Sequence, residues 1–315
     1  MQTGEKIVAF LLVTVILTVY SSEILLISIF AYRKFTASGD PGILWSKYAI
    51  LVHLLAIAGL FCLAYSYFVE PYRIEVKTVK IRTAKLSEAS FRLVQISDLH
   101  CDTKLRSEKK LIRLVNAAEP DIIVFTGDTL RLRTPSGLPL FKNTMKNLKA
   151  KLAKFAVRGN VDIWYLPDLD FFGGTGFQVL DANTLKLQKQ GETLYISGLS
   201  CEHPSALRGL LKDIPRDCFS IFLYHYPDLI EDLNNLNVDL YLCGHTHGGQ
   251  IALPFYGALI TLSKFGKKYE SGMYTVDDTI LYINRGIGGH ASNARFFARP
   301  EITVFDITTN RIRAD

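Results

Sequence analysis

Two long apolar segments begin the chain, and shorter apolar runs follow them at regular intervals. Residues 7–32 contain a single charged residue, Glu23, and residues 48–69 contain no residue that could carry a positive charge except His53 and no acidic residue. Each segment is long enough to cross a hydrocarbon core of about 30 Å as a helix. A signal peptide is the alternative for the first segment, but its apolar stretch is too long and no small-residue cleavage site is evident. We therefore predict a membrane anchor over residues 1–70, folded as a two-helix transmembrane hairpin.

The remaining chain alternates short apolar runs with helix-patterned polar segments, which is typical of an α/β domain. The strongest strand predictions are residues 91–97, 121–126, 153–158, 218–224 and 238–242. Alternating segments predict further strands over residues 73–81, 272–276, 280–283 and 301–307, and a hairpin over 184–199. Helices are expected over residues 107–118, 140–152, 206–212 and 228–236. We expect a connecting strand within residues 71–90 and one catalytic domain over 91–315.

Polar side chains that can bind metals follow each of the five strongest predicted strands. They are Asp98, His100, Asp128, Asn160, His225, His245 and His247. The carboxyl edge of an α/β sheet is where such folds place their sites, so five such endings in register indicate one common site. The rings of His245 and His247 point to the same side of an extended backbone, because the two residues are two positions apart. Imidazole suits zinc, iron, manganese or cobalt better than magnesium or calcium, so the pattern predicts a transition-metal centre.

These residues resemble the five sequence motifs of the calcineurin-like metallophosphoesterases. The resemblance covers about residues 91–305, and the Gly-Gly-Gln that follows His247 resembles a membrane-associated bacterial branch of that family. It implies an α/β fold, specifically a four-layer α/β/β/α sandwich, here preceded by the transmembrane hairpin. It also implies two divalent metal ions, expected to be manganese, with iron or zinc as alternatives.

The resemblance further implies which residues bind each ion. One ion would be bound by Asp98, His100, Asp128 and His247, and the other by Asp128, Asn160, His225 and His245. Asp128 would bridge them, since two cations about 3.5–4 Å apart need a shared anion. A water held between the ions would lose a proton near neutral pH and become a nucleophile toward phosphorus.

Val161 departs from the family pattern, in which a histidine usually follows the Gly-Asn motif directly. That histidine is thought to stabilise the transition state or help protonate the leaving oxygen, and valine can do neither. Three interpretations stay open: the chain is inactive, another residue substitutes, or the leaving group needs no proton. Candidate substitutes are His290, His203, Arg158, Arg131 and Arg133, of which Arg131, Arg158 and His290 are also predicted to bind substrate. An alkoxide leaving group benefits strongly from an acid and a phosphate does not, which favours a pyrophosphate bond.

Charge and composition narrow the partners and the location of the protein. The net charge of +6 suits anionic headgroups and phosphorylated substrates. No long basic stripe with interleaved aromatic residues is present, so nucleic acid is not expected as a partner. The loop between the predicted spans carries three basic residues, Arg33, Lys34 and Lys47, whereas the opposite side carries six, Lys6, Arg73, Lys77, Lys80, Arg82 and Lys85. This imbalance predicts a multi-pass protein of the inner (cytoplasmic) membrane with a cytoplasmic catalytic domain.

The apolar segment 254–262 follows the metal motif, where a polar loop would be expected. Three lysines come soon after it, namely Lys264, Lys267 and Lys268. Two interpretations stay open: ordinary packing beneath a long loop, or contact with a bilayer whose anionic headgroups meet the lysines. In the second interpretation, Phe255, Tyr256 and Leu259 would contact lipid.

Together, these features favour a membrane-anchored, metal-dependent hydrolase that acts on a phosphorylated or nucleotide-linked lipid. Within the resemblance, the specific candidate reaction is cleavage of the pyrophosphate of UDP-2,3-diacylglucosamine in lipid A biosynthesis. A general phosphodiesterase is one alternative. A non-catalytic membrane scaffold is another, but scaffolds of this fold tend to lose metal ligands, and none of the seven is missing here.

Overall fold

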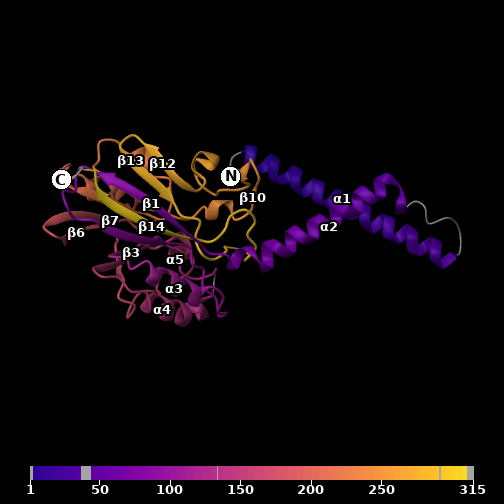
Figure 1. The fold of residues 1–315 in the computed structure, drawn as a ribbon, viewed down its shortest axis with the longest axis horizontal. Coiled ribbons are helices and arrows are strands. Elements are labelled where there is room, and N and C mark those ends of the chain that lie inside the picture. The colour runs from indigo at the N-terminus through magenta and orange to yellow at the C-terminus, as the bar shows by residue number, and fades with distance from the viewer. Residues whose placement is uncertain (1–2, 37–43, 133, 291, 311–315) are drawn as a thin grey trace, which may run out of the picture.

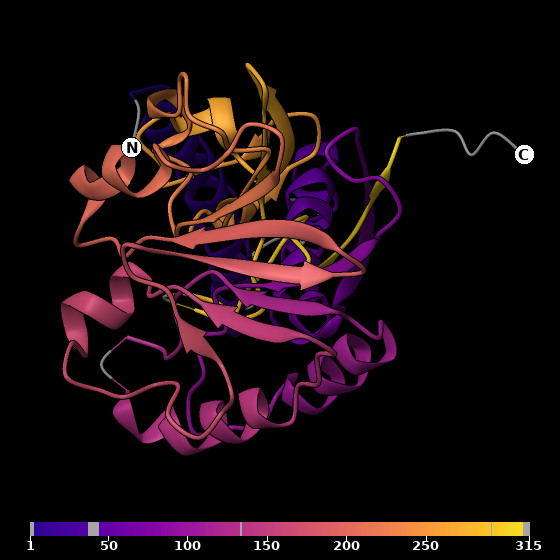
Figure 2. The same cartoon turned by 90° about the vertical axis from the view of Figure 1, so that its left-hand side faces the viewer.

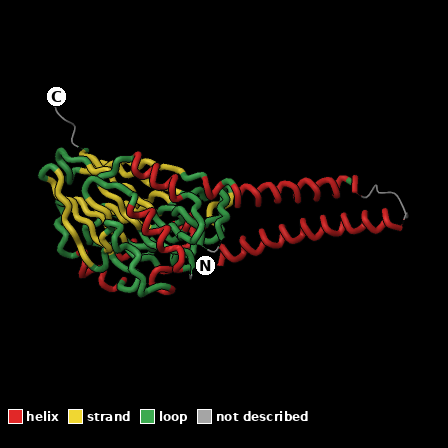
Figure 3. The backbone as a smooth tube through the Cα atoms, turned by 90° about the horizontal axis from the view of Figure 1, so that it is seen from below, coloured by secondary structure: helices red, strands yellow, loops and turns green. Residues whose placement is uncertain are grey.

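A long helical hairpin projects from an α/β domain in the computed structural model, which describes residues 3–36, 44–132, 134–290 and 292–310 (Figure 1). The hairpin consists of α1 (Thr3–Thr36) and α2 (Lys47–Phe68), which run side by side (Figure 3). Both helices are long and apolar enough to cross a membrane. Ser46 caps α2, since its side chain accepts a hydrogen bond from the Ala49 N–H. The two segments predicted as spans are therefore both helical.

Two six-stranded sheets form the centre of the domain (Figure 2). The strands of the first sheet are, in spatial order, β1 (Glu75–Thr83), β14 (Glu301–Thr309), β2 (Phe91–Ile96), β3 (Ile122–Phe125), β4 (Ala153–Ala156) and β5 (Gln178–Val179). Those of the second are β12 (Gly272–Val276), β13 (Thr279–Ile283), β9 (Leu240–Cys243), β8 (Phe219–Leu223), β7 (Glu192–Gly198) and β6 (Asn183–Lys189). Strands β2, β3 and β4 are parallel to one another, as are β7, β8 and β9, so the ends of these six strands define two shared edges.

Apolar side chains on both faces of the sheets create four layers. In β2, Phe91 and Leu93 face the second sheet, whereas Val94 and Ile96 face the helices outside. This alternation is what a strand buried on both faces requires. Helices α3 (Glu108–Ala117) and α4 (Leu138–Lys146) cover the outside of the first sheet, and α6 (Leu207–Leu211) packs on the outside of the second. The predicted α/β/β/α sandwich is confirmed.

The shorter elements lie outside the two six-stranded sheets. They are η2 (Glu70–Tyr72), η3 (Pro135–Gly137), α5 (Asn160–Tyr165), η4 (Pro204–Ala206), η5 (Ile230–Asp232), η6 (His247–Gly249), β10 (Ala252–Leu253), β11 (Gly257–Ala258) and η7 (Gly266–Tyr269). Strands β10 and β11 form a small antiparallel pair at the base of the hairpin (Figure 1).

Two sequence predictions of local structure need correction. The helix expected over residues 140–152 ends at Lys146, because the Lys149 N–H bonds to the Asn116 side chain instead of continuing the helix. Residues 228–236 form only the single 3₁₀ turn η5 instead of a helix. The apolar segment 254–262 contains the short strand β11.

Candidate metal centre

The seven predicted ligands converge at one edge of the two sheets. Asp98 follows β2, Asp128 follows β3 and Asn160 opens α5 directly after β4. From the second sheet, the loops after β8 and β9 supply the remaining ligands, His225, His245 and His247. Because these strands run parallel within each sheet, their carboxyl ends bring the loops together. His100 joins them from the loop after Asp98.

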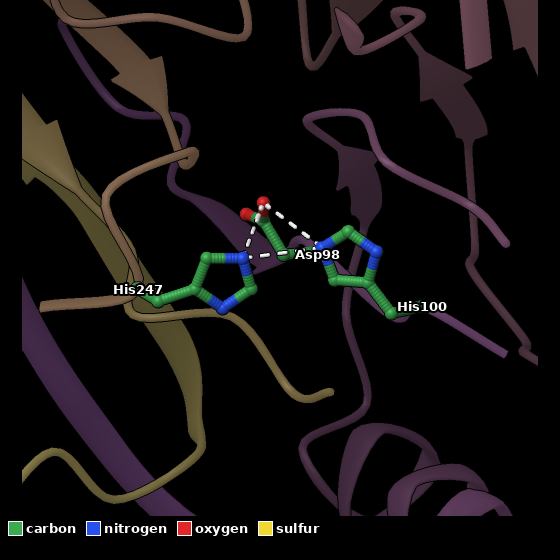
Figure 4. Close-up of side chains that lie close together, drawn as sticks. All are labelled: Asp98, His100 and His247. Atoms are coloured by element: carbon green, nitrogen blue, oxygen red, sulfur yellow. Dashed lines mark hydrogen bonds and ion pairs between the residues drawn. The ribbon is translucent and has the colours of Figure 1, made fainter. Parts of the chain in front are cut away.

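Asp98, His100 and His247 form the first cluster (Figure 4). The Asp98 Oδ1 atom lies 3.4 Å from His247 Nε2 and 4.0 Å from His100 Nε2. The two imidazole Nε2 atoms lie 3.1 Å apart, and the rings stack with centroids 5.0 Å apart. All three side chains are buried, so one small volume is surrounded by a carboxylate and two imidazoles.

Asp128 and His225 form a second cluster with Asn160. The His225 Nε2 atom lies 3.4 Å from Asp128 Oδ2 and 3.1 Å from Asn160 Oδ1. Asp128 Oδ2 also lies 3.6 Å from His100 Nε2, which belongs to the first cluster. Asp128 therefore occupies the position between the two clusters that a bridging carboxylate needs.

His245 completes the second cluster from the opposite side. Its ring lies edge-on to that of His225, with centroids 5.1 Å apart. Its backbone N–H donates to Asp98 Oδ2, and its Nε2 atom faces the carbonyl oxygen of Leu262 at 3.3 Å. The other ring nitrogen, Nδ1, is the one that could bind an ion.

The backbone at this edge is strained in a way that concentrates ligands. Asp98, His100, Asp128, His245 and His247 all have positive φ angles, between 43° and 70°. Such angles are uncommon for residues other than glycine and cluster at functional sites, where the surrounding structure stabilises them. They turn short loops tightly enough to present adjacent side chains to one point.

Close backbone approach explains two of the motif glycines. A Cβ atom at position 159 would lie 2.2 Å from Asp128 Oδ1, and one at position 244 would lie 2.1 Å from Asp98 Oδ2. Neither distance is possible for non-bonded atoms, so only glycine allows these loops to pass beside the carboxylates.

The pKa values show how strongly the buried groups act on one another. Burial raises the pKa of Asp98 to about 7. Burial also acts to raise the pKa of Asp128, but His225 and His100 outweigh it and lower this pKa overall. Burial acts to lower the pKa of His225, yet Asp128 raises it to about 10. Burial lowers the pKa of His100 to about 4 and that of His245 to about 3, so these rings are neutral at pH 7 and each has a lone pair available for a metal ion.

The donor set fits divalent metal ions in two further respects. One nitrogen of each of His100, His225 and His245 faces a backbone carbonyl, of Leu130, Thr126 and Leu262 respectively. A carbonyl can only accept, so that nitrogen carries a hydrogen in each ring. In the neutral rings of His100 and His245 the other nitrogen keeps a lone pair for an ion, as in metal-binding histidines, whereas His225, whose pKa Asp128 raises, would lose its second proton when an ion binds. Asp98 Oδ1 is also buried without a hydrogen-bond partner among the described residues, which marks it as a group that a cation would satisfy.

Asp162 is a supporting residue that the sequence reasoning missed. Its carboxylate accepts hydrogen bonds from the N–H groups of Asp128, Thr129 and Gly159, and from the Thr129 hydroxyl. It therefore joins the loop after β3 to the loop after β4, and both loops carry ligands. Its position directly after the unusual Val161 was the available signal.

Arg295 was expected to extend the apolar wall with Phe296 and Phe297, and its role as a support for His247 was missed. The side chain is buried, and it donates to the carbonyl oxygens of Gly288, Ala298 and Arg285. Its Nη2 atom also lies 3.2 Å from His247 Nδ1. Burial lowers the pKa of Arg295 to about 10, so it stays charged at pH 7. The signal in the sequence was a single charged residue within the apolar run 294–298.

A cavity of about 640 Å³ leads to the metal ligands. Its lining includes the predicted ligands Asp128, Asn160, His245 and His247, together with the apolar or aromatic residues Trp164, Tyr165, Tyr226, Ile260 and Leu262. The cavity therefore combines a ligand cluster with an apolar wall.

The structure treats the three predicted substrate residues differently. His290 lines the cavity, and its ring lies edge-on to His100 with centroids 5.7 Å apart. Arg158 instead pairs with Glu202, and Arg131 lies near Asp102. Neither arginine is among the residues that line the cavity. Of the other candidate substitutes for the missing histidine, His203 is paired with Asp181 on the surface, and Arg133 lies outside the described residues.

Comparison with known proteins agrees with this geometry. Residues 91–249 match the calcineurin-like phosphoesterase family. The chain is 34% identical over 267 residues to the uncharacterized metallophosphoesterase YkuE of Bacillus subtilis, covering 77% of this chain and 88% of that protein. The chain thus belongs to the calcineurin-like phosphoesterase family, and it is a metal-dependent phosphoester hydrolase whose family uses a dinuclear divalent metal site.

Two further relatives have more specific names. The chain is 29% identical to the UDP-2,3-diacylglucosamine pyrophosphatase LpxG of Chlamydia muridarum, a match that covers 68% of this chain and 82% of that protein. It is 25% identical to the phosphodiesterase YaeI of Escherichia coli, with 77% of this chain and 92% of that protein covered.

Proposed function

We propose that this chain is a membrane-anchored hydrolase that uses two divalent metal ions to cleave the pyrophosphate bond of a lipid-linked substrate. The specific substrate we propose is UDP-2,3-diacylglucosamine, cleaved in lipid A biosynthesis at the inner membrane. The observation that carries the proposal is a cavity lined by ligands of both proposed ions, Asp128, Asn160, His245 and His247, together with apolar side chains. A phosphorylated headgroup and an acyl chain would each meet matching chemistry there.

The side chains at the cavity floor divide into two ligand sets. We assign Asp98, His100, Asp128 and His247 to one ion, and Asp128, Asn160, His225 and His245 to the other. When bound, two such ions supply charge neutralisation at the phosphoryl group and lower the pKa of an attacking water. The protein holds its ligands in place before substrate arrives, so little reorganisation is needed during the reaction.

The position of Val161 bears on the leaving group. Its side chain is completely buried, and its backbone N–H donates to Asp128 Oδ1, so the residue positions a ligand but cannot donate a proton to substrate. Two titratable side chains that line the cavity have no assigned ligand role and lie against predicted ligands. The His290 ring is edge-on to His100, and the Tyr226 ring is edge-on to His245. A nucleotide monophosphate leaves readily without protonation, whereas an alkoxide does not. This difference supports a pyrophosphate substrate, as does the similarity to LpxG.

A product assay with purified full-length protein tests the proposal. With manganese present, the protein is expected to release UMP from UDP-2,3-diacylglucosamine in mixed micelles, faster than it hydrolyses an alkyl phosphomonoester. Chelation should abolish the reaction and added manganese should restore it. Asp128→Asn removes the charge shared by both ions and should lower the rate by about three orders of magnitude while the protein stays folded.

Other outcomes of the same assay would point to the alternatives. Hydrolysis of soluble phosphodiesters without UMP release would replace the pyrophosphatase by a general phosphodiesterase, for which the similarity to YaeI is the supporting observation. Failure to bind manganese and to hydrolyse any phosphate ester would favour a membrane scaffold.

A further inference from the structure

The amino-terminal end of α1, which lies next to the catalytic domain, is anchored to the loop that forms the apolar wall of the cavity. Glu5 is buried, and its carboxylate accepts hydrogen bonds from the N–H group and the hydroxyl of Thr261, at 3.3 and 2.8 Å. Thr261 lies between Ile260 and Leu262, which both line the cavity. The first helix therefore begins beside the cavity and contacts its lining loop directly.

The carboxyl-terminal end of α2 is also anchored to the catalytic domain by hydrogen bonds. The carbonyl oxygen of Ser66 accepts a hydrogen bond from the Arg295 N–H at 2.8 Å, and Glu70 accepts one from the Ala298 N–H at 2.6 Å. The guanidinium of Arg295 in turn contacts His247. One residue thus connects the end of the second helix to a metal ligand.

Apolar, exposed helix surface begins directly at these anchor points. Ile7 is 55% exposed, and it lies only two residues beyond the buried Glu5, which corresponds to a rise of about 3 Å along the helix. In α2, Phe68 is 73% exposed although it lies between the anchoring Ser66 and Glu70. Exposed apolar surface of a transmembrane helix belongs in the hydrocarbon region. The bilayer must therefore begin at the surface of the catalytic domain.

Exposed apolar side chains of the domain continue this surface. Phe255, at the turn between β10 and β11, is fully exposed, and Leu262 and Phe297 are more than half exposed. Phe297 packs edge-on against Phe296, which itself contacts Tyr65 of α2. Leu262 follows the residue that binds Glu5. Leu262 and Phe297 therefore adjoin the two helix anchors, and Phe255 lies at the turn of the β10–β11 pair beside the base of the hairpin, which makes lipid their natural partner.

This set differs from the one that the sequence suggested. Leu259 is buried, and Tyr256 lies under the Lys267 ammonium, 4.0 Å from its ring centroid. Lys267 and Lys268 are engaged with Glu270 and Glu231 respectively. Of residues 254–262, the lipid contacts we infer are therefore Phe255 and Leu262.

We propose that the cavity opens at the bilayer surface, where Phe255, Leu262 and Phe297 insert into the lipid, so that substrate enters from the leaflet and not from bulk water. The lipid class of the substrate rests on the proposed function, whereas the insertion itself rests on the helix anchors and the exposed side chains. An amphiphile could place its acyl chains among these residues while its phosphates reach the ligands. The hairpin would then position the site in addition to retaining the protein at the membrane.

Quenching of tryptophan fluorescence by brominated lipids tests the insertion without reference to activity. In full-length protein with Trp45 and Trp164 replaced by phenylalanine, Phe255→Trp provides a single reporter in vesicles of brominated phosphatidylcholine. Leu152→Trp is the matched control, because Leu152 is exposed but precedes β4, at the end of the strand away from the ligands. Quenching at position 255 is expected to exceed that at 152 by about threefold or more. Equal quenching at the two positions would overturn the proposal.

Hydrolysis of two substrates tests the consequence for entry. The double variant Phe255→Ser, Phe297→Ser is expected to slow cleavage of vesicle-borne lipid pyrophosphate about tenfold. It should leave hydrolysis of soluble bis(p-nitrophenyl) phosphate within about twofold of the wild type, and Leu152→Ser should affect neither substrate. Equal losses on both substrates would contradict entry from the leaflet. If the wild type cleaves only the soluble ester, the proposed lipid substrate is wrong, while the quenching result still decides whether this surface inserts.

Discussion

Individual residues outside the ligand set hold the metal centre in place. Asp162 joins two ligand loops through three backbone N–H groups, and Arg295 joins His247 to the loops at residues 285–298. Such supporting contacts orient ligands and commonly influence metal affinity nearly as much as the ligands themselves. The chemistry of this site therefore depends on more residues than the seven proposed ligands.

Asp162→Asn is expected to weaken metal binding while the fold is retained. The amide keeps one acceptor oxygen but turns a donor group toward backbone N–H groups, which loosens the loops carrying Asp128 and Asn160. We expect a loss of about 10- to 100-fold in manganese affinity, measured by titration calorimetry. Asp170→Asn is the control, because Asp170 is an exposed turn residue that also accepts from backbone N–H groups. Equal affinity in both variants would contradict the role assigned to Asp162.

His290→Ala is expected to affect substrates according to their leaving groups. His290 lines the cavity, and its ring lies edge-on to that of His100. If it assists departure of the leaving oxygen, the variant should lose about 10- to 100-fold in kcat with an alkyl ester but much less with a pyrophosphate. Initial rates for a series of esters of increasing leaving-group pKa measure this. A uniform loss across the series would instead assign His290 to binding.

At the scale of elements, the hairpin has a defined register between its helices. Glu23 and His53 form a contact at 2.7 Å, and the Tyr20 hydroxyl donates to the Ala56 carbonyl oxygen. A Cβ atom at Gly59 would lie 2.6 Å from that hydroxyl. Small residues and polar pairs of this kind hold transmembrane helices together. The single acidic residue of the first span is thus accounted for by pairing within the hairpin.

Gly59→Leu should destabilise the hairpin. The larger side chain displaces the Tyr20 hydroxyl from Ala56 and separates the helices, at a cost of about 1–3 kcal/mol. Gly4→Leu is the control, because a Cβ at Gly4 has no atom within 4 Å in the described structure. Thermal unfolding of purified protein in detergent should show a lower midpoint for Gly59→Leu only. A matching decrease for both variants would show that helix packing is not the cause.

At the scale of the whole molecule, the amino terminus and the catalytic domain lie on the same side of the hairpin (Figures 1 and 3). The contact between Glu5 and Thr261 makes this arrangement part of the folded structure. The orientation across the membrane is predicted from the basic residues at the two ends of the spans. Six lie on the side of the catalytic domain and three on the opposite side, and an excess of Lys and Arg favours the cytoplasmic side.

A reporter at the carboxyl terminus is expected to locate the catalytic domain in the cytoplasm. A green fluorescent protein fusion should fluoresce in a Gram-negative host, and an alkaline phosphatase fusion should be inactive, because basic residues are retained on the cytoplasmic side. Replacing Arg73, Lys77 and Lys80 by glutamine should reduce the bias. An active phosphatase fusion and a dark fluorescent fusion of the unaltered chain would reverse the predicted topology.

Much of the fold and of the ligand set was predictable because both depend on local patterns. Each predicted ligand lies in the loop that follows an apolar run, and the period of that run identifies the strand. The predictions for the end of α4 and for a helix over residues 228–236 were wrong, because non-local contacts such as that between Asn116 and Lys149 override helical periodicity. The supporting roles of Asp162 and Arg295 were missed because their importance lies in what they contact.

The sequence by itself determined the two apolar helices, the strand-ending ligands and the absence of the usual histidine at position 161, since residue type and spacing specify all three. Only the tertiary structure decided that the cavity lies beside the end of the hairpin. That relation depends on contacts such as Glu5 with Thr261, which are separated by 256 positions. Periodicity describes how a segment folds, but the meeting of two distant segments depends on how all the layers pack.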